Sequence, residues 1–238
     1  MTDSTPGLVP STSPRSDVVQ RHELTRADRD AMFALYTRYF ATSDRMVFER
    51  DLAEKQWVIL LRDDDRAIGG FSTLMAMPVA NATVFFSGDT IVARHRWGSW
   101  DLPRLWGRHV FSLAGENAYW FLISSGFRTY RTLPLFFRRF HPAFDGDTPA
   151  ETKALLDTIA TLKFGSAYDP ASGVIRLASP APLRAGISDP AARVARDPHV
   201  RFFVHANPGH AEGDELACIV KVEESNLTSA GLRMLGRR

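Results

Sequence analysis

The spacing of apolar residues predicts that the folded part of the chain begins with two helices. Residues 25–40 repeat large apolar side chains at helical spacing. Thr25 and Asp28 form a capping-box pattern at the start of this segment. A shorter helix is expected over residues 43–55. Residues 1–20 are rich in Ser, Thr and Pro without periodic apolar positions, so we expect a disordered tail there.

After residue 56 the apolar pattern changes from the helical period to that of β-strands. Branched and aromatic residues dominate three short segments, and polar turns near residues 63–65 and 81 separate them. Because short polar turns connect them, these segments are expected to pair as antiparallel neighbours. The pattern therefore predicts a three-stranded meander over residues 57–61, 67–77 and 83–92.

The most informative stretch of the chain runs from Thr83 to Tyr130. A strand leads into a basic loop with a glycine, then into a helix with Asp101 as the expected N-cap, and then into an apolar strand over 118–124. Such a strand–loop–helix–strand unit directs the free N–H groups and the positive end of the helix dipole toward the loop. Because the loop is rich in arginine, a phosphate group is the ligand that it suits best.

The last third of the chain gives weaker signals. Residues 142–150 have the composition of a linker, and a helix is expected to follow them to about residue 163. Beyond that helix, the pattern predicts three strands and a closing helix, over residues 174–177, 200–205, 215–222 and 226–235.

The bulk composition narrows the class of protein. With 238 residues, 45% of them hydrophobic, the chain is long enough for one large globular domain. No apolar run reaches the length of a membrane span, and the first residues lack the pattern of a signal peptide. Cys218 is the only cysteine, which excludes an internal disulfide and favours a cytoplasmic protein. No cluster of metal-ligating residues is visible, so we expect no metal.

The charge is unevenly distributed, although the net charge is only +2. Between Arg94 and His141 the chain has eight arginines and two acidic residues. Such a segment forms either a ligand-binding face or a solvated surface with ordinary ion pairs, and the sequence leaves both open. Nucleic acid is disfavoured as a partner because the net charge is small and the aromatic residues follow core-like spacing.

The order of these elements resembles that of the GNAT-type acyltransferase superfamily over about residues 24–140. The resemblance implies an α+β fold, with a mixed, mainly antiparallel sheet flanked by helices at 21–145 and a C-terminal α/β extension at 146–238. The extension would complete the sheet or the acceptor pocket. In this family the fourth strand has a bulge and diverges from the fifth, and acyl-coenzyme A lies in the opening. Gly88 is where a bulge would form most easily.

The family holds the donor pyrophosphate on backbone N–H groups of a loop of the form Arg/Gln-x-x-Gly-x-Gly/Ala. Here the corresponding loop begins with His95 and ends with Trp100, where the family has a small residue. The resemblance implies donor contacts by residues of this loop and of the flanking strands: Gly88, Arg94, His95, Arg96, Gly98, Ser99 and Ser124.

Acyl transfer to an amine needs a base for the amine and donors for the oxyanion, and an acid can protonate the leaving thiolate. By family position, Asp89 is the candidate base and Tyr130 the candidate acid. From the residues alone, Asp89 could equally be a solvated carboxylate and Tyr130 a core aromatic residue. His205 and His210 could line an acceptor pocket. Cys218 lies among apolar neighbours and is expected to be an inert buried thiol.

Two functions therefore remain open. The first is an enzyme that moves an acyl group from a thioester of coenzyme A or acyl carrier protein to the amine of a small-molecule acceptor; Asp89 and Tyr130 favour it. The second is a non-catalytic GNAT-like module whose basic face binds an acidic ligand or partner; Trp100 favours it because its side chain would crowd the phosphates. The acceptor, the acyl length and the formation of a homodimer stay undetermined.

Overall fold

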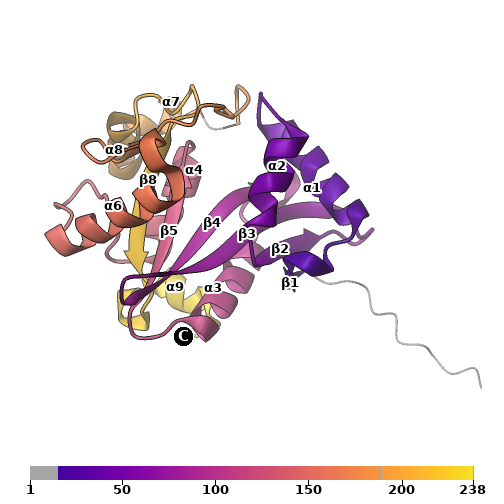
Figure 1. The fold of residues 1–238 in the computed structure, drawn as a ribbon, viewed down its shortest axis with the longest axis horizontal. Coiled ribbons are helices and arrows are strands. Elements are labelled where there is room, and N and C mark those ends of the chain that lie inside the picture. Colours follow the sequence, from indigo (N-terminus) through magenta and orange to yellow (C-terminus); the bar gives the residue numbers. More distant parts are fainter. Residues whose placement is uncertain (1–15, 188, 238) are drawn as a thin grey trace, which may run out of the picture.

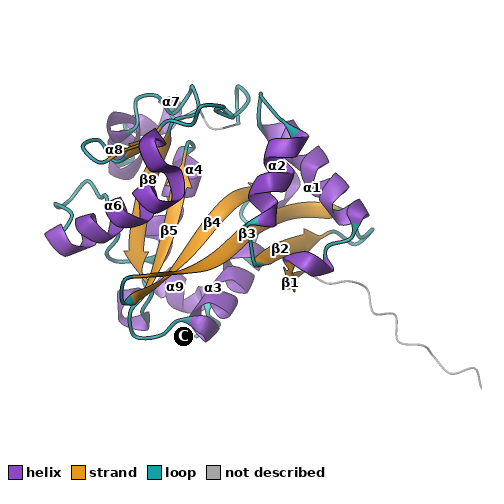
Figure 2. Cartoon of the chain, in the orientation of Figure 1, coloured by secondary structure: helices purple, strands orange, loops and turns teal. Residues whose placement is uncertain are grey.

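One mixed sheet runs through the protein, and helices cover both of its faces (Figures 1 and 2). The computed structural model describes residues 16–187 and 189–237. Within them eight strands follow the order β1-β2-β3-β4-β5-β8-β7-β6, and all neighbours are antiparallel except β4 and β5. The strands are β1 (Asp17–Gln20), β2 (Trp57–Arg62), β3 (Ile68–Val79), β4 (Ala82–Val92), β5 (Ala118–Ser124), β6 (Tyr168–Asp169), β7 (Val174–Ile175) and β8 (Glu215–Lys221).

The helices bury their apolar residues in three clusters. On one face, α1 and α2 cover the strands near the N-terminal edge and α6 covers the other half of the sheet. On the opposite face, α3, α4, α5, α8 and α9 share the largest cluster. No helix in the described ranges is long and apolar enough to cross a membrane. The helices are α1 (Arg26–Tyr39), α2 (Arg45–Ala53), α3 (Asp101–Leu113), α4 (Phe127–Tyr130), α5 (Thr132–Phe136), α6 (Ala150–Phe164), α7 (Ala191–Val194), α8 (Pro198–Ala206) and α9 (Ser229–Met234).

The predicted fold class is confirmed, because the sheet is mixed, mainly antiparallel and flanked by helices. The first helix starts where the capping box placed it: the Thr25 hydroxyl accepts from the backbone N–H of Asp28, and the Asp28 carboxylate accepts from that of Thr25. The meander of β2, β3 and β4 and the strand over 118–124 also form as expected. The start of α3 differs by one residue, since Trp100 is its N-cap and Asp101 lies in its first turn.

The strand expected over 200–205 was wrong, because this segment lies in helix α8. The Asp197 side chain accepts from the backbone N–H groups of His199 and Val200, and Pro198 occupies the first helical turn, where it needs no acceptor. The bulky residues of the segment fit a strand as well as a helix. The N-terminal cap therefore decides in favour of the helix.

The disordered tail predicted over residues 1–20 also extended too far along the chain. Asp17–Gln20 form β1 and pair with β2 along the edge of the sheet. Val18 and Val19 supply apolar side chains that pack against the cores on the two faces. Four residues can join a sheet when an adjacent strand offers unpaired backbone groups, even if their own pattern is weak. The rest of the predicted tail, residues 1–15, lies outside the described residues.

Strand β4 is distorted in its second half. Its register against β3 shifts between Ser72 and Leu74, so that Gly88 and Asp89 together stand opposite Thr73. A Cβ atom on Gly88 would lie 2.6 Å from Thr73 Oγ1, which explains why this position holds a glycine. The bulge predicted at Gly88 is thus confirmed.

The parallel pairing of β4 with β5 ends just before this bulge. The last paired residues are Ser87 and Leu122, and beyond them the two strands diverge (Figure 1). On its other side β5 stays paired with β8 as far as Ser124 and Leu216. The divergence therefore separates the sheet into two halves that remain joined at one end of β4 and β5.

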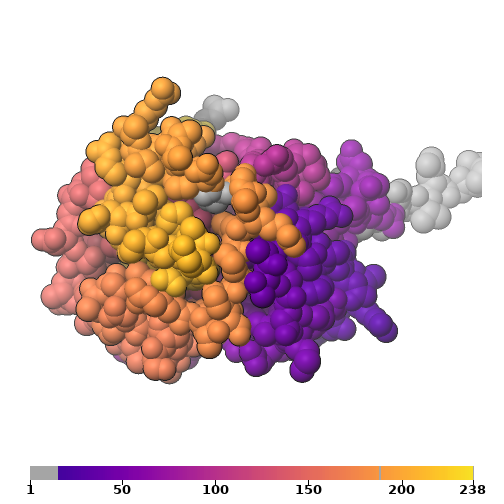
Figure 3. Space-filling model, turned by 90° about the horizontal axis from the view of Figure 1, so that it is seen from above, coloured from indigo at the N-terminus to yellow at the C-terminus, as the bar shows by residue number. Residues whose placement is uncertain are grey.

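A connector from the C-terminal part of the chain spans the open end of the sheet. The backbone N–H of Ala41 donates to Pro182 at 2.8 Å, and that of Arg184 donates to Tyr39 at 2.8 Å. Phe40 forms an isolated bridge with Leu183. In Figure 3 this orange connector lies against the indigo N-terminal helices. It links the end of α1 to the half of the sheet that contains β5 and β8.

We predict that Gly231→Ala destabilises the protein, because a Cβ atom there would collide with the carbonyl oxygen of Phe136, to which α9 docks. Overpacking of this kind costs about 1–3 kcal/mol, and each kcal/mol lowers Tm by about 2–4 °C in a chain of this size. Thermal unfolding followed by circular dichroism measures the loss. Gly115→Ala is the control, since a Cβ atom at Gly115 meets no atom within 4 Å. Equal Tm values for the two variants would contradict the packing described here.

Candidate functional site

A cavity of about 370 Å³ lies where β4 and β5 diverge. Its lining comes from both faces of the sheet: Trp106 and Trp120 belong to the cluster around α3, whereas Ile91 and Ile123 pack with the clusters on the other face. The opening therefore passes through the sheet. A ligand held in it could be reached by a second molecule from the opposite face.

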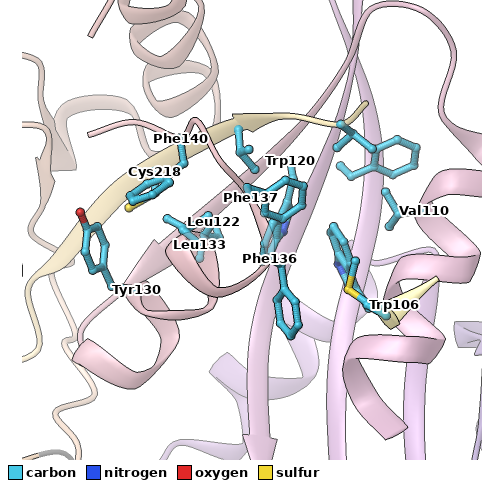
Figure 4. Packing of buried hydrophobic residues seen from close by; sticks show 14 of the residues in the cluster. Trp106, Val110, Trp120, Leu122, Tyr130, Leu133, Phe136, Phe137, Phe140 and Cys218 are labelled. Atoms are coloured by element: carbon cyan, nitrogen blue, oxygen red, sulfur yellow. The ribbon is translucent and has the colours of Figure 1, made fainter. Parts of the chain in front are cut away.

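Two tryptophans and Ser87, all of which line the cavity, are joined by hydrogen bonds. Trp120 Nε1 donates to Ser87 Oγ at 2.9 Å and Trp106 Nε1 donates to it at 3.3 Å. The centres of the two indole rings lie 4.3 Å apart. Figure 4 shows both tryptophans within the core cluster. Beyond Ser87, β4 has no strand partner on the β5 side within the described residues. Backbone N–H and C=O groups of this edge therefore face the cavity.

The loop after β4 presents free backbone donors to the cavity. The N–H groups of Trp97 and Ser99 already donate to carbonyl oxygens. Those of Gly98, Trp100 and Leu102 have no acceptor in the described part of the chain. Gly98 has a φ of +88°, a left-handed conformation that favours glycine, and it lines the cavity together with Ser99 and Leu102. The start of α3 thus offers N–H groups to an anion.

His95 and Arg96, the two basic residues of this loop that were predicted to contact the donor, bind to the β2–β3 hairpin instead. Arg96 Nε donates to Asp63 Oδ1 at 2.6 Å, and Arg96 Nη2 donates to the carbonyl of Arg62 at 2.6 Å. His95 Nε2 lies 3.1 Å from Asp63 Oδ2. Burial alone would raise the pKa of Asp63, but the hydrogen bonds from Arg96 and His95 outweigh it and lower that pKa. These side chains fasten the loop to the β2–β3 hairpin.

Arginines without acidic partners gather at the rim of the cavity instead. The guanidinium carbon of Arg128, in α4, lies 4.5 Å from the centre of the Trp97 ring, and that of Arg94 lies 5.3 Å from it. Burial, followed by repulsion from Arg193 and Arg94, lowers the pKa of Arg128. No carboxylate within the described ranges lies within 4 Å of Arg94 or Arg128. This rim therefore carries uncompensated positive charge.

Trp100 does not crowd the cavity, contrary to the expectation from the loop pattern. Its ring packs on Phe136 at 5.9 Å, and the guanidinium groups of Arg104 and Arg233 lie 5.9 Å from the ring centre. It is absent from the residues that line the cavity. As the N-cap of α3 it turns its side chain toward α5 and α9, so its size is used in packing.

Asp89 lies on the face of the sheet covered by α1 and α2. Asp89 and Ile91 are two residues apart on β4, so their side chains point to the same face, and Ile91 packs in the cluster of those helices. Burial, and then repulsion from Asp51, raise the pKa of Asp89 to about 7, against the attraction of Lys55. A carboxylate that titrates near neutral pH is well suited to act as a general base.

Glu215, at the start of β8, is a second carboxyl group of this kind. Burial raises its pKa to about 8, repulsion from Asp89 and Asp214 adds to the shift, and hydrogen bonds from Ser125 oppose it. Tyr36 of α1 belongs to the same surroundings, because after burial the next causes that raise its pKa are Asp89, Glu215 and Asp51.

The structure does not bring Tyr130 to the cavity. Its side chain is fully buried, and its hydroxyl donates to the carbonyl of Pro142 at 2.9 Å. Burial raises its pKa far above the ordinary value. Figure 4 shows Tyr130 beside Cys218, at the other end of the cluster from Trp106. The family position of the acid therefore corresponds here to a core residue, and we assign Tyr130 a packing role.

The hydroxyl of Ser124 is likewise hydrogen-bonded to the backbone. It is 1% exposed, its hydroxyl donates to the carbonyl of Gly126 at 2.8 Å, and it does not line the cavity. His205 is exposed on α8 and His210 packs against Phe203, and neither lines the cavity. Cys218 is fully buried, as expected, and burial raises the pKa of its thiol.

Of the predicted donor residues, the structure thus places Gly88, Arg96, Gly98 and Ser99 in the lining of the cavity. Arg94 does not line it but lies next to Trp97, which does. Sequence reasoning missed Arg128 and Glu215. Arg128 follows β5 by only a few residues and was counted among the basic residues, so its position after a strand end was a usable signal. Glu215 lies far along the chain, and nothing in the sequence pairs it with Asp89.

No known protein-family model matches the sequence, and a search of curated proteins finds no relative. Among solved structures, one similar chain is a GNAT family N-acetyltransferase (YhbS) from Escherichia coli in complex with CoA. It is 15% identical, with a TM-score of 0.36, over 55% of this chain and 70% of that one. Another is described as histone acetyltransferase HPA2 and related acetyltransferase, from Corynebacterium glutamicum. It is 15% identical, with a TM-score of 0.37, over 57% of this chain and 92% of that one. The similarity is one of fold. Such low scores transfer no activity, so the function must come from this chain's own geometry.

We predict that Asp89→Asn stabilises the protein at high pH. The pKa of Asp89 is about 7 in the folded chain against an ordinary 3.8, so the folded state keeps a proton that the unfolded state has lost. Stability therefore falls as pH rises through this window. The charged and titratable groups facing Asp89 are Asp51, Lys55, Tyr36 and Glu215, and none is changed by the substitution.

At pH 9 the variant should gain about 1–2 kcal/mol in the free energy of unfolding, and at pH 4 it should gain none. Urea unfolding at the two pH values measures the difference. The exposed Asp64→Asn is the matched control and should show no such pH-dependent gain. A gain of equal size at both pH values would mean that Asp89 is ionised in the folded protein at low pH as well.

Proposed function

We propose that this chain is an N-acyltransferase, which moves an acyl group from a coenzyme A thioester to the amine of a small acceptor. The observation that supports this best is the cavity that passes through the sheet where β4 and β5 diverge, lined by Gly88 and Thr90 on either side of Asp89. A thioester entering from the α3 face and an amine entering from the α1–α2 face would meet in this opening.

The donor's parts match what surrounds the cavity. A pantetheine arm is long and narrow and carries amides, which can pair with the backbone groups of β4 left free beyond Ser87. The pyrophosphate would lie at the start of α3, where Gly98, Trp100 and Leu102 offer N–H groups. Arg128 and Arg94 would neutralise phosphate charge at the rim, because they have no carboxylate partner there.

Asp89 is the base in this scheme. An amine acceptor reaches neutral pH as an ammonium ion, so a proton must leave before its nitrogen can attack. Ionised Asp89 takes that proton, and the free nitrogen then adds to the thioester carbonyl carbon, whose C=O electron pair moves onto oxygen. The resulting oxyanion needs hydrogen-bond donors, and the unpaired backbone N–H groups along β4 are those nearest the opening.

Collapse of this intermediate breaks the C–S bond, and the thiolate of coenzyme A leaves. Net, an ammonium ion and a thioester become an amide, a free thiol and one proton. A thiolate leaves far more readily than an alkoxide because thiols ionise at much lower pH, so the reaction does not require a dedicated acid. This fits the placement of Tyr130, whose hydroxyl is bonded to Pro142 inside the core.

The first test is donor binding. We expect acetyl- and longer acyl-coenzyme A to bind, and Arg128→Ala to weaken binding about tenfold or more, because one charge-assisted contact with phosphate is lost. S-acetylpantetheine lacks the phosphates, so its affinity should not depend on Arg128. Isothermal titration calorimetry measures both ligands, and the highly exposed Arg26→Ala is the control. Absence of binding by every acyl-coenzyme A at millimolar concentration would exclude the proposal.

The second test is the role of Asp89. Thiol release from acetyl-coenzyme A in the presence of primary amines should fall by about a hundredfold or more in Asp89→Asn. In the unchanged protein the rate should rise with pH and level off above an apparent pKa near 7, because the base works only when ionised. An unchanged rate in Asp89→Asn would remove Asp89 from the reaction.

The third test separates Tyr130 from the chemistry. Tyr130→Phe should keep the full transfer rate, because its hydroxyl reaches only the Pro142 carbonyl. The same variant should lose about 1 kcal/mol of stability with the hydrogen bond. A transfer rate that drops while the Tm stays constant would contradict this assignment and restore Tyr130 as an acid.

A further inference from the structure

The hydrophobic core itself forms one wall of the cavity. Four side chains both line the cavity and belong to the core cluster on the α3 face: Trp106 of α3, Trp120 of β5, Phe136 of α5 and Met234 of α9. We call them the apolar pocket, and Figure 4 shows three of them, Trp106, Trp120 and Phe136, within that cluster. Both indole groups donate to Ser87, the last residue of β4 that pairs with β5, so the pocket adjoins the bulge at Gly88.

Helix α9 closes the pocket against α3. The Cε and Cγ atoms of Met234 lie 3.0 Å from the position of a Cβ atom on Gly107, the residue after Trp106. Thr228, which caps α9, donates from its backbone N–H to the carbonyl of Phe136 at 3.0 Å. Met234 is 1% exposed, and a methionine side chain adapts its shape to what it contacts. It is therefore the wall residue best able to adjust to the length of a bound chain.

Most hydroxyl groups that line the cavity already have a partner. Ser72 Oγ and Thr90 Oγ1 share a hydrogen bond of 2.7 Å, and Thr132 Oγ1 donates to the carbonyl of Thr129 at 2.7 Å. Ser87 Oγ accepts from the two indoles. A polar ligand group placed among them would give up its bonds to water without replacement, a cost that an apolar group does not have. The pocket therefore favours an apolar ligand group.

The cavity has room for more than an acetyl group. Its volume is about 370 Å³, whereas a cavity of about 150 Å³ lined by Leu, Ile and Phe already takes up benzene. Folded proteins leave few voids larger than a water molecule, because the atoms around a void lose contacts. An apolar space of this size beside the bulge therefore indicates a ligand part that fills it.

The bulge separates the surroundings that suit the two parts of an acyl-coenzyme A. Its pantetheine arm has amide groups, and the backbone groups that can pair with them lie along β4 beyond Ser87. The two tryptophans of the apolar pocket bond to Ser87 itself, which precedes the bulge. A thioester at the bulge would thus have its amides on one side and the apolar pocket on the other. The acyl chain, which has no polar group beyond its carbonyl, is the part that suits the pocket.

We infer that the donor carries an apolar acyl chain of about six to ten carbons, which lies in the apolar pocket against Met234. This deepens the proposed function and rests on it for the reaction. The chemistry is unchanged, because the amine nitrogen still attacks the thioester carbon and the thiolate of coenzyme A still leaves. Trp106, Trp120 and Phe136 contact the sides of the chain, and Met234 limits its length. The product is then an amide with an apolar tail.

Chain length is tested with donors that differ in nothing else. Acetyl-, butanoyl-, octanoyl- and lauroyl-coenzyme A are titrated by calorimetry. Burial of each methylene group should tighten binding about threefold to fourfold up to octanoyl-coenzyme A, and lauroyl-coenzyme A should gain nothing further. Equal affinities for acetyl- and octanoyl-coenzyme A would overturn the inference.

Two substitutions of Met234 should move the preferred chain length in opposite directions. Met234→Ala widens the pocket and should raise the ratio of lauroyl to octanoyl transfer about tenfold, whereas Met234→Phe narrows it and should lower the ratio of octanoyl to acetyl transfer about tenfold. A methionine that only stabilised the fold would affect all donors alike. Leu113→Ala is the control, because Leu113 is 47% exposed on α3 and does not line the cavity, so both ratios should stay constant.

Thermal unfolding shows whether each variant is folded. Phe136→Leu also widens the pocket and takes the place of Met234→Ala if that variant is not folded. Ratios that do not change in the folded variants would overturn the inference.

Octanol, which has the chain but no coenzyme, separates this inference from the proposed function. We expect octanol to bind to the unchanged protein and about tenfold more weakly to Met234→Phe. If octanol binds in this way and no acyl-coenzyme A binds, the apolar pocket stands and the proposed function fails. If acetyl-coenzyme A binds and octanoyl-coenzyme A binds no more tightly, the inference fails and the proposed function stands. Octanol binding that Met234→Phe leaves unchanged would place the chain elsewhere and overturn the inference.

Discussion

The bulge in β4 is the constraint on which the rest of the structure depends. A strand that sets two residues against one on its neighbour must bend, and here the bend turns β4 away from β5 immediately after Ser87. Gly88 permits this because Thr73 and Lys55 occupy the space that a side chain would need. The same distortion frees backbone groups along one edge of β4 and opens a passage through the sheet, which is lined by Gly88 and Thr90 on either side of Asp89. Without it the sheet would be continuous at this point, and the cavity between β4 and β5 would not exist.

The two faces of the sheet offer opposite electrostatic surroundings to that passage. The rim near α3 and α4 has free backbone N–H groups and arginines that repel each other, whereas the face under α1 and α2 has carboxyl groups that repel each other. In each case the fold keeps like charges together without internal partners, which lowers stability on its own. Such arrangements suit ligands of the opposite charge. A donor rich in phosphate and an acceptor with an ammonium group would relieve both, each on its own side.

Local patterns predicted much of this architecture. Local preference and the overall fold agree at three places. These are the capping box at Thr25, the alternating pattern of the strands between residues 57 and 92, and the single glycine at the bulge. The errors occurred where local evidence was ambiguous. The bulky run around Val200 fits strand and helix equally, and the Asp197 cap with Pro198 decided it; Trp100 was read as an obstacle, although its ring packs away from the cavity on Phe136.

The sequence by itself determined the order of elements from α1 to β5 and the place of the bulge, because each depends on residues within a few positions of one another. Only the tertiary structure decided which side chains are free to bind. Arg96 donates to Asp63 of a distant hairpin, and Tyr130 donates to Pro142 in the core, so the polar groups of both side chains already have partners. Conversely, the pairing of β8 with β5 brings Glu215 close enough to Asp89 for their charges to repel, although more than a hundred residues separate them along the chain. Partners of this kind are set by how the sheet closes, and no local pattern of residue types records them.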